Sequence, residues 1–219
     1  MEEGSRDSSW RYDQGTKAAR YRARSLARTQ REASMLQRLF EGLDLGHVLD
    51  APCGAGRLEE LLRAHGVSWC GLDRSLAMLR EARLAGATRL LRGSLDALPF
   101  EDAAFDTVVC FRFLHHLEAR DQNDILREVA RVALKTVIVS AFTPYSLHGV
   151  RRRIRATLLR KRPSRHATPL PRMDATMAQS GFYRTGFERD GLARDLYVAR
   201  YEVSGDAGSL DARGGSSTA

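Results

Sequence analysis

The spacing of apolar positions along this chain changes near residue 47. Residues 16–41 contain no glycine or proline and are rich in Ala, Leu, Arg and Gln, a composition typical of a helix. Within this segment Leu36, Leu39 and Phe40 recur at helical spacing, so we expect them to face a core. From residue 47 onward, short apolar runs alternate with segments of helical periodicity.

This alternation predicts five strands with helices between them. The strands are expected at 47–51, 68–73, 88–93, 105–111 and 135–142. The helices are expected at 58–65, at 75–85 with Ser75 as the N-cap, and at 122–134 with Asp121 as the cap. A helix over 173–180 and a strand pair from 181–191 and 193–203 are expected to close the fold. Strands that alternate with helices indicate an α/β fold with a parallel sheet.

The alternation stops after the fifth strand, where residues 143–172 carry nine Lys and Arg side chains and no Asp or Glu. We therefore expect three regions. A basic helical segment over 1–42 forms a lid, an α/β domain over 43–203 contains the basic insert 143–172, and a tail over 204–219 is rich in Gly and Ser. The tail is expected to be disordered because it has too little apolar surface to bury.

Composition narrows the class of protein. The chain has 219 residues, enough for one domain with a sizeable core, and a net charge of +8, so an anionic partner or substrate is worth testing. Cys53, Cys70 and Cys110 have no zinc-ligand spacing, so neither a metal site nor a disulfide framework is expected. The N-terminus lacks an apolar signal core, and no apolar run approaches the roughly 18 residues of a membrane span. We expect a cytoplasmic protein without a transmembrane segment.

Candidate chemistry begins where the first predicted strand ends. Asp50 is followed by a loop of small residues that includes Gly54 and Gly56 and opens a helix, so a ligand can approach the backbone closely. The second strand ends in Asp73, whose carboxylate can accept from both hydroxyls of a ribose. Glu59 stands where a dinucleotide fingerprint needs its third glycine. The pattern predicts a nucleoside site, and Asp50 favours a ligand with cationic groups rather than phosphates.

Three segments together carry a resemblance to a known family: VLDAPCGAGRL, GLDRSLAML and GSLDALPFEDAAFDTVVCFRFLHHL. Over about residues 43–142 the chain resembles the class I S-adenosylmethionine-dependent methyltransferases, in the small-molecule, quinone-biosynthesis-like branch called methyltransferase type 11. The resemblance implies a Rossmann-like sheet of seven strands in the order 3-2-1-4-5-7-6, with strand 7 antiparallel and helices on both faces. It implies S-adenosylmethionine as the cofactor.

The resemblance also implies which residues contact the cofactor. The first loop would hold the methionine end, Asp73 the ribose, and Arg74 with Ser94 the adenine. The full implied set is Asp50, Ala51, Cys53, Gly54, Gly56, Asp73, Arg74, Ser94, Leu95, Cys110 and Phe111. Two positions depart from the family pattern: Pro52 stands where a glycine is usual, and Ser94 replaces an Asp and loses its charge.

The residues expected on the acceptor side of the site give a less specific prediction. His115 and His116 follow the fourth strand at the edge where such sheets bind ligands, so they are candidate catalytic bases, or they only shape the loop. Arg112 either extends to solvent or meets an anionic substrate group. The Asn/Asp-Pro-Pro-Tyr/Phe tetrapeptide of base-methylating members is missing after the fourth strand, which disfavours nucleobase amines.

The resulting function prediction is methyl transfer from S-adenosylmethionine to a small-molecule acceptor that is lipid-soluble or anionic. The alternatives are a tRNA-modifying methyltransferase, which the paired histidines also resemble, and an inactive methyltransferase-like binding module. We expect the basic insert to lie on the acceptor side of the site. Its charge is compatible with an anion, a membrane surface, RNA or a solvated surface alone, and nucleic acid is not the favoured partner because Tyr145 is its only aromatic residue.

Overall fold

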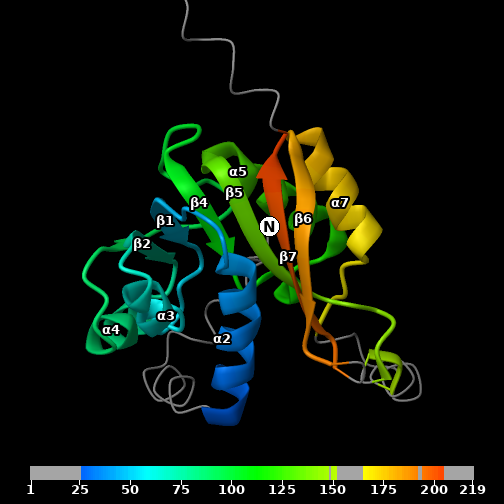
Figure 1. The fold of residues 1–219 in the computed structure, drawn as a ribbon, viewed down its shortest axis with the longest axis horizontal. Helices are drawn as coiled ribbons and strands as arrows, with labels where there is room; N and C mark the ends of the chain where they lie inside the picture. The colour runs from blue at the N-terminus through cyan, green and yellow to red at the C-terminus, as the bar shows by residue number, and fades with distance from the viewer. Residues whose placement is uncertain (1–25, 148, 152–164, 192–193, 205–219) are drawn as a thin grey trace, which may run out of the picture.

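A computed structural model describes residues 26–147, 149–151, 165–191 and 194–204 of the chain. Within them, seven strands form one sheet in the order β3-β2-β1-β4-β5-β7-β6 (Figure 1). The strands are β1 (His47–Asp50), β2 (Ser68–Asp73), β3 (Leu90–Arg92), β4 (Phe105–Cys110), β5 (Ala133–Phe142), β6 (Phe182–Arg189) and β7 (Leu196–Val203). Strands β1 to β5 run parallel, and β7 is antiparallel to both of its neighbours. The predicted fold class is confirmed.

Helices cover both faces of this sheet. They are α2 (Leu26–Phe40), α3 (Glu59–Ala64), α4 (Leu76–Leu84), α5 (Ala119–Val132) and α7 (Leu170–Gln179), with a short 3-10 helix η2 (Leu114–His116) after β4. In Figure 1, α3 and α4 gather at the β2 side of the sheet, whereas α7 lies beside β6. Helix α2 lies near the middle of the sheet, between these two groups.

One face of the sheet is packed by α2 and α3. Leu36, Leu39 and Phe40 are buried together with Val109 of β4 and Ile138 of β5. The prediction that these three α2 residues face a core is therefore confirmed. The burial of this apolar stripe, more than helix propensity alone, holds α2 against the sheet.

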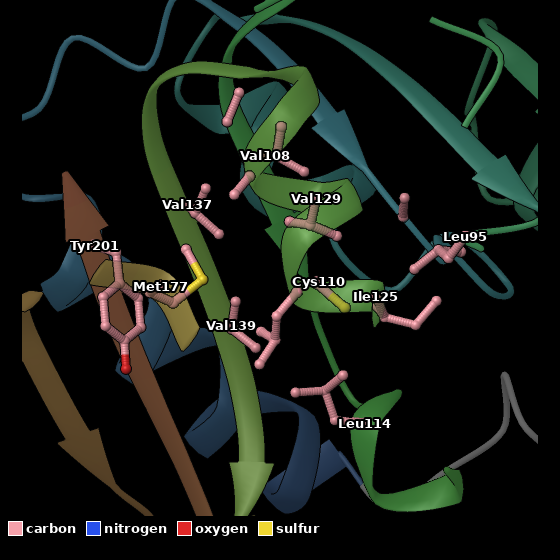
Figure 2. Packing of buried hydrophobic residues seen from close by; sticks show 14 of the residues in the cluster. Leu95, Val108, Cys110, Leu114, Ile125, Val129, Val137, Val139, Met177 and Tyr201 are labelled. Carbon is pink, nitrogen blue, oxygen red and sulfur yellow. The ribbon is translucent and has the colours of Figure 1, made fainter. Parts of the chain in front are cut away.

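The opposite face is packed by α5 and α7. Figure 2 shows Val129 of α5 and Met177 of α7 facing Val137 and Val139 of β5, and all four side chains are fully buried. Cys110 lies inside this same cluster, among apolar side chains. The core thus occupies both faces of the sheet, and the loops at the strand ends remain for ligand contacts.

The predicted ends of the helices and strands agree less well with the structure than their predicted types. Ser75 is the N-cap of α4 as predicted, since its Oγ accepts a hydrogen bond from Met78 N at 3.3 Å. For α5 the predicted helix is present, but the predicted cap was wrong. This helix starts at Ala119 with Glu118 as the N-cap, so Asp121 lies inside the first turn, where its charge complements the helix dipole without capping.

Helix α7 and strand β5 also begin earlier than predicted. The helix starts at Leu170 rather than at residue 173, because Pro171 fits a first turn, where no backbone N–H is needed. Strand β5 starts at Ala133, immediately after α5 ends at Val132. The first error comes from assigning residues 170–172 to the basic insert, and the second from continuing the helix through residue 134.

Parts of the predicted regions lie outside the described residues: 1–25 of the N-terminal segment, 148 and 152–164 of the basic insert, and 205–219 of the tail. The division into 1–42, 43–203 and 204–219 therefore stays a prediction. None of the helices in the described part of the chain is long and apolar enough to cross a membrane.

Candidate functional site

A pocket opens at the carboxyl ends of β1, β2 and β4, and it measures about 810 Å³ including its open mouth. The described residues that line it are Asp50, Pro52, Cys53, Gly54, Arg57, Leu58, Asp73, Arg74, Ser75, Met78, Ser94, Leu95, Phe111, Arg112, Phe113 and His116. Eight of the cofactor residues implied by the resemblance are among them.

The glycine loop and the end of β2 are held together by Asp73. One carboxylate oxygen accepts from Gly54 N at 2.9 Å, and the other accepts from Ser75 N at 2.9 Å. Gly54 takes a φ of +57°, a conformation that costs glycine little. The two bonds fix the glycine loop against the end of β2.

Asp50 is the most deeply buried charged group in the pocket wall, with 1% of its surface exposed. Burial raises the pKa of its carboxyl well above the usual range, the nearby Asp73 raises it further, and the Arg57 guanidinium opposes the shift. Among the residues that the structure describes, none donates a hydrogen bond to Asp50 Oδ2. A buried acceptor without a donor in a pocket wall is where a cationic ligand group fits.

Three residues of the implied cofactor set do not line the pocket in the described structure: Ala51, Gly56 and Cys110. Ala51 and Cys110 are fully buried in the core on the α5 face. Gly56 packs on α4, where a Cβ would lie 3.1 Å from Ala82 Cα, and its φ is +74°. Its role in this structure is a close approach between the loop and α4.

The two pocket-side cysteines are poor candidates for a nucleophile. Cys53 lines the pocket and Cys110 lies behind it, and burial raises the pKa of both thiols far above neutral pH. Because the thiolate is the reactive form, these side chains act as apolar wall and core.

The two histidines have different surroundings. His116 lines the pocket, whereas His115 is buried and its ring stacks on Phe142 at 4.2 Å between centroids. The two imidazole rings are 4.1 Å apart. Of the pair, His116 is therefore the one placed to meet a ligand, and His115 packs behind it.

Residue Gln122 fixes the turn that carries these histidines. Its Nε2 donates to Leu114 O at 2.9 Å and to Leu117 O at 3.1 Å. Its Oε1 accepts from Thr168 Oγ1 at 2.9 Å and from Arg172. We call these five residues the Gln122 cluster. All four hydrogen-bonding positions of the amide are used, so the turn is held between α5 and the start of α7.

Sequence reasoning missed a buried ionic group beside the pocket. Glu32 of α2 pairs with both Arg57 and Arg112, and we call these three residues the Glu32 cluster. A signal was present in the sequence, because Glu32 is the only acidic residue between positions 16 and 40 of a basic segment. Its partners are far away in the chain, so spacing alone does not connect them.

Comparisons with known proteins agree with this geometry. Residues 48–135 match the family model described as "Methyltransferase domain". The chain is 35% identical over 115 residues to a malonyl-[acyl-carrier protein] O-methyltransferase of Salmonella typhimurium, covering 52% of this chain and 45% of that protein. It is 32% identical over 101 residues to a ubiquinone biosynthesis O-methyltransferase of Bordetella avium, covering 43% and 41%. The chain thus spans less than half the length of these relatives.

A solved structure extends the similarity in fold to most of the chain. It is a magnesium protoporphyrin IX methyltransferase from Synechocystis PCC 6803 with bound SAH. The TM-score is 0.75 at 18% sequence identity, covering 90% of this chain and all of that one. At this low sequence identity, the comparison supports a shared fold only.

Proposed function

We propose that this chain transfers a methyl group from S-adenosylmethionine to a small-molecule acceptor, and the match of residues 48–135 to the methyltransferase-domain model supports this proposal. The single observation that carries the proposal is the pair of carboxylates in the pocket wall. Asp50 offers a buried acceptor to a cation, and Asp73 ends the neighbouring strand beside the glycine loop. The ammonium of the cofactor fits the first carboxylate and its ribose hydroxyls fit the second.

When bound, the cofactor supplies a methyl group on a sulfonium, ready for in-line displacement. The contribution of the chain is then orientation and exclusion of water. Phe111, Phe113 and Met78 provide the apolar part of the pocket wall. His116 is assigned as the base that accepts a proton from the methyl acceptor. His115 stacks on Phe142 and packs against the His116 ring, which it supports.

The acceptor side of the site is proposed to include the basic insert. Both described ends of this segment are hydrogen-bonded next to the histidine turn. Thr143 N donates to Asp195 O at 2.8 Å, His166 N donates to His115 O at 2.9 Å, and Thr168 N donates to Phe142 O at 2.8 Å. These contacts support a location of the insert beside the pocket mouth rather than on the adenine side.

A lipid-soluble or membrane-associated acceptor fits the described start of the insert. Tyr145 and Leu147 are 77% and 68% exposed, and Arg151 follows them. Exposed apolar side chains next to a run of arginines are typical of surfaces that meet anionic lipids. This observation favours such an acceptor over RNA.

Calorimetric titration of the full chain with S-adenosylmethionine and, separately, with NADH tests the proposed cofactor. We expect S-adenosylmethionine to bind more tightly, and tighter binding of NADH would contradict the proposal. Cell-extract fractions incubated with the chain and S-adenosylmethionine are then screened by mass spectrometry. The acceptor is the compound whose mass rises by about 14 Da, the mass of one added CH₂ group.

The role of the insert is tested with that acceptor. Replacing Arg151, Arg152, Arg153 and Arg155 with Gln should weaken acceptor binding, flatten its salt dependence and leave S-adenosylmethionine affinity unchanged. Unchanged acceptor kinetics would reject the placement of the insert. A selective loss of tRNA binding with a smaller salt slope would instead favour the RNA alternative.

A further inference from the structure

Residues 165–169 lead from the basic insert back to helix α7, and we call this segment the return strap. His166 N donates to His115 O at 2.9 Å, and Thr168 N donates to Phe142 O at 2.8 Å. Thr168 is fully buried. The return strap is therefore fixed by its backbone to the histidine turn and to the end of β5.

Arg165 is the first residue of the return strap, and its side chain lies against an aromatic ring. Its guanidinium carbon is 5.6 Å from the centroid of the Phe142 ring, and the residue is exposed. The same ring is stacked on His115 at 4.2 Å, and the Arg112 guanidinium carbon lies 5.4 Å from its centroid. A cation–π contact orients a guanidinium without using its N–H groups as hydrogen-bond donors.

The Phe142 ring connects Arg165 with the pocket. Arg112 and His116 line the pocket, and the rings of His116 and His115 are 4.1 Å apart. Since Arg112 and His115 both contact Phe142, Arg165 lies one aromatic ring away from residues of the pocket wall. This is the side of the proposed base rather than the side of the glycine loop.

The charges of its neighbours make Arg165 suitable for an anion. Arg112 pairs with Glu32, whereas within the described ranges no carboxylate forms an ion pair with Arg165. Residues 143–172, which include the return strap, contain no Asp or Glu in the sequence. An exposed guanidinium in such surroundings offers a planar pair of donors that matches a carboxylate or a phosphate group.

We propose that Arg165 is a specificity-determining residue that binds an anionic group, a carboxylate or a phosphate, on the methyl acceptor. The inference rests on the proposed function, because it places the acceptor between His116 and the return strap. The group that receives the methyl lies at His116, and the anionic group of the same molecule lies at Arg165. Such an acceptor can still have an apolar body, because the anionic group occupies only one end of it.

Three probes that differ only at one end test this subsite: phenylacetate, phenylacetamide and benzylphosphonate. Their dissociation constants are measured by NMR titration into the full chain saturated with S-adenosylhomocysteine. The parent chain should bind the better of the two anionic probes about fivefold more tightly than the amide, the size expected for an exposed charge pair. The better probe identifies the acidic group as carboxylate or phosphate.

Two variants of Arg165 should change this preference in different degrees. In Arg165→Gln the preference for an anionic probe should fall below about twofold, because the cation is lost. Arg165→Lys keeps the charge without the planar pair of donors, so it should retain part of the preference. Calorimetry should give all variants the S-adenosylmethionine affinity of the parent, which shows that they are folded.

A matched control is Arg127→Gln, which removes an exposed arginine of α5 that pairs with Asp124. It changes the net charge by the same amount as Arg165→Gln, and its probe preference should equal that of the parent chain. An equal loss in both variants would show general charge attraction only and overturn the assignment of Arg165.

Two further outcomes would also contradict the inference. A parent chain without a preference for either anionic probe, including one that binds none of the three, would overturn the subsite. A preference that persists in Arg165→Gln would mean that other groups bind the anion. Failure of the parent chain to bind S-adenosylmethionine would instead contradict the proposed function.

Discussion

Two buried polar side chains differ in how their hydrogen bonds are used: Gln122, which holds the histidine turn, and Asp50, which lines the pocket. In the Gln122 cluster, every position of a fully buried amide has a partner. At Asp50, a carboxylate oxygen just as deeply buried accepts from none of the described residues. The first arrangement stabilises the folded chain, because breaking it would orphan several groups at once. The second lowers the stability of the ligand-free chain, and the cost is offset only when a ligand donates to that oxygen.

The largest effect is expected from breaking the Gln122 cluster. Gln122→Met should lower the free energy of unfolding by about 3–5 kcal/mol, because two carbonyls, a hydroxyl and a guanidinium lose their buried partner. Thermal unfolding without ligand should shift down by roughly 10 °C. S-adenosylmethionine affinity of the folded variant, measured by calorimetry, should stay within about threefold of the parent. A melting temperature equal to that of the parent would show that the cluster is not structural.

Asp73→Ala should lower both the stability of the fold and the affinity for the cofactor, because Asp73 holds the glycine loop and faces the pocket. We expect S-adenosylmethionine affinity to fall by about 1.5–3 kcal/mol, the value of hydrogen bonds to a charged group. Calorimetry measures this loss. A change in the dissociation constant of less than about threefold, which is under 0.7 kcal/mol, would remove the ribose assignment.

Asp50→Asn should separate the two properties. Affinity for S-adenosylmethionine should fall about tenfold or more, because the ammonium loses a charged acceptor. The free energy of unfolding should stay equal or rise, because burial makes ionisation of this carboxyl costly and a neutral amide of the same shape avoids that cost. Urea unfolding of both chains measures the second effect, and a marked destabilisation would contradict the comparison.

The smallest effect is a pH dependence of stability. Burial raises the pKa of the Asp50 carboxyl well above its usual range, so the unfolded chain ionises first as pH rises. The folded chain then holds the extra proton, and stability from this group is present below about pH 4 and declines as pH rises toward the folded pKa. The slope is at most about 1.4 kcal/mol per pH unit. As the pH rises from 4 to 8, the melting temperature of the parent chain should therefore fall relative to that of Asp50→Asn.

Much of the fold could be predicted because its causes are local. Apolar runs marked the strands, and Ser75 marked a helix start through its own side chain. The strand order came from the family resemblance rather than from periodicity. The ends of α5 and α7 were missed because Asp121 and Pro171 are favourable at more than one position of a first turn.

The pocket lining was predictable where it comes from the two short motifs that end β1 and β2. Asp50, Gly54 and Asp73 meet at neighbouring strand ends, as parallel strands require. Gly56 belongs to the first of these motifs but packs on Ala82, and a motif does not tell packing from ligand contact. Glu32 reaches Arg57 across 25 residues through the tertiary fold, and nothing local in the sequence specifies that pairing.

The direct passage from α5 into β5 limits where this chain can change its length. The helix ends at Val132 and the strand begins at Ala133, so no loop residue lies between them to absorb an insertion. One added residue in α5 would turn its apolar stripe by about 100° relative to the sheet. An engineer who wishes to add a tag or a fluorescent reporter should therefore avoid this junction and use the turn at 101–104, whose Glu101 and Asp102 are exposed.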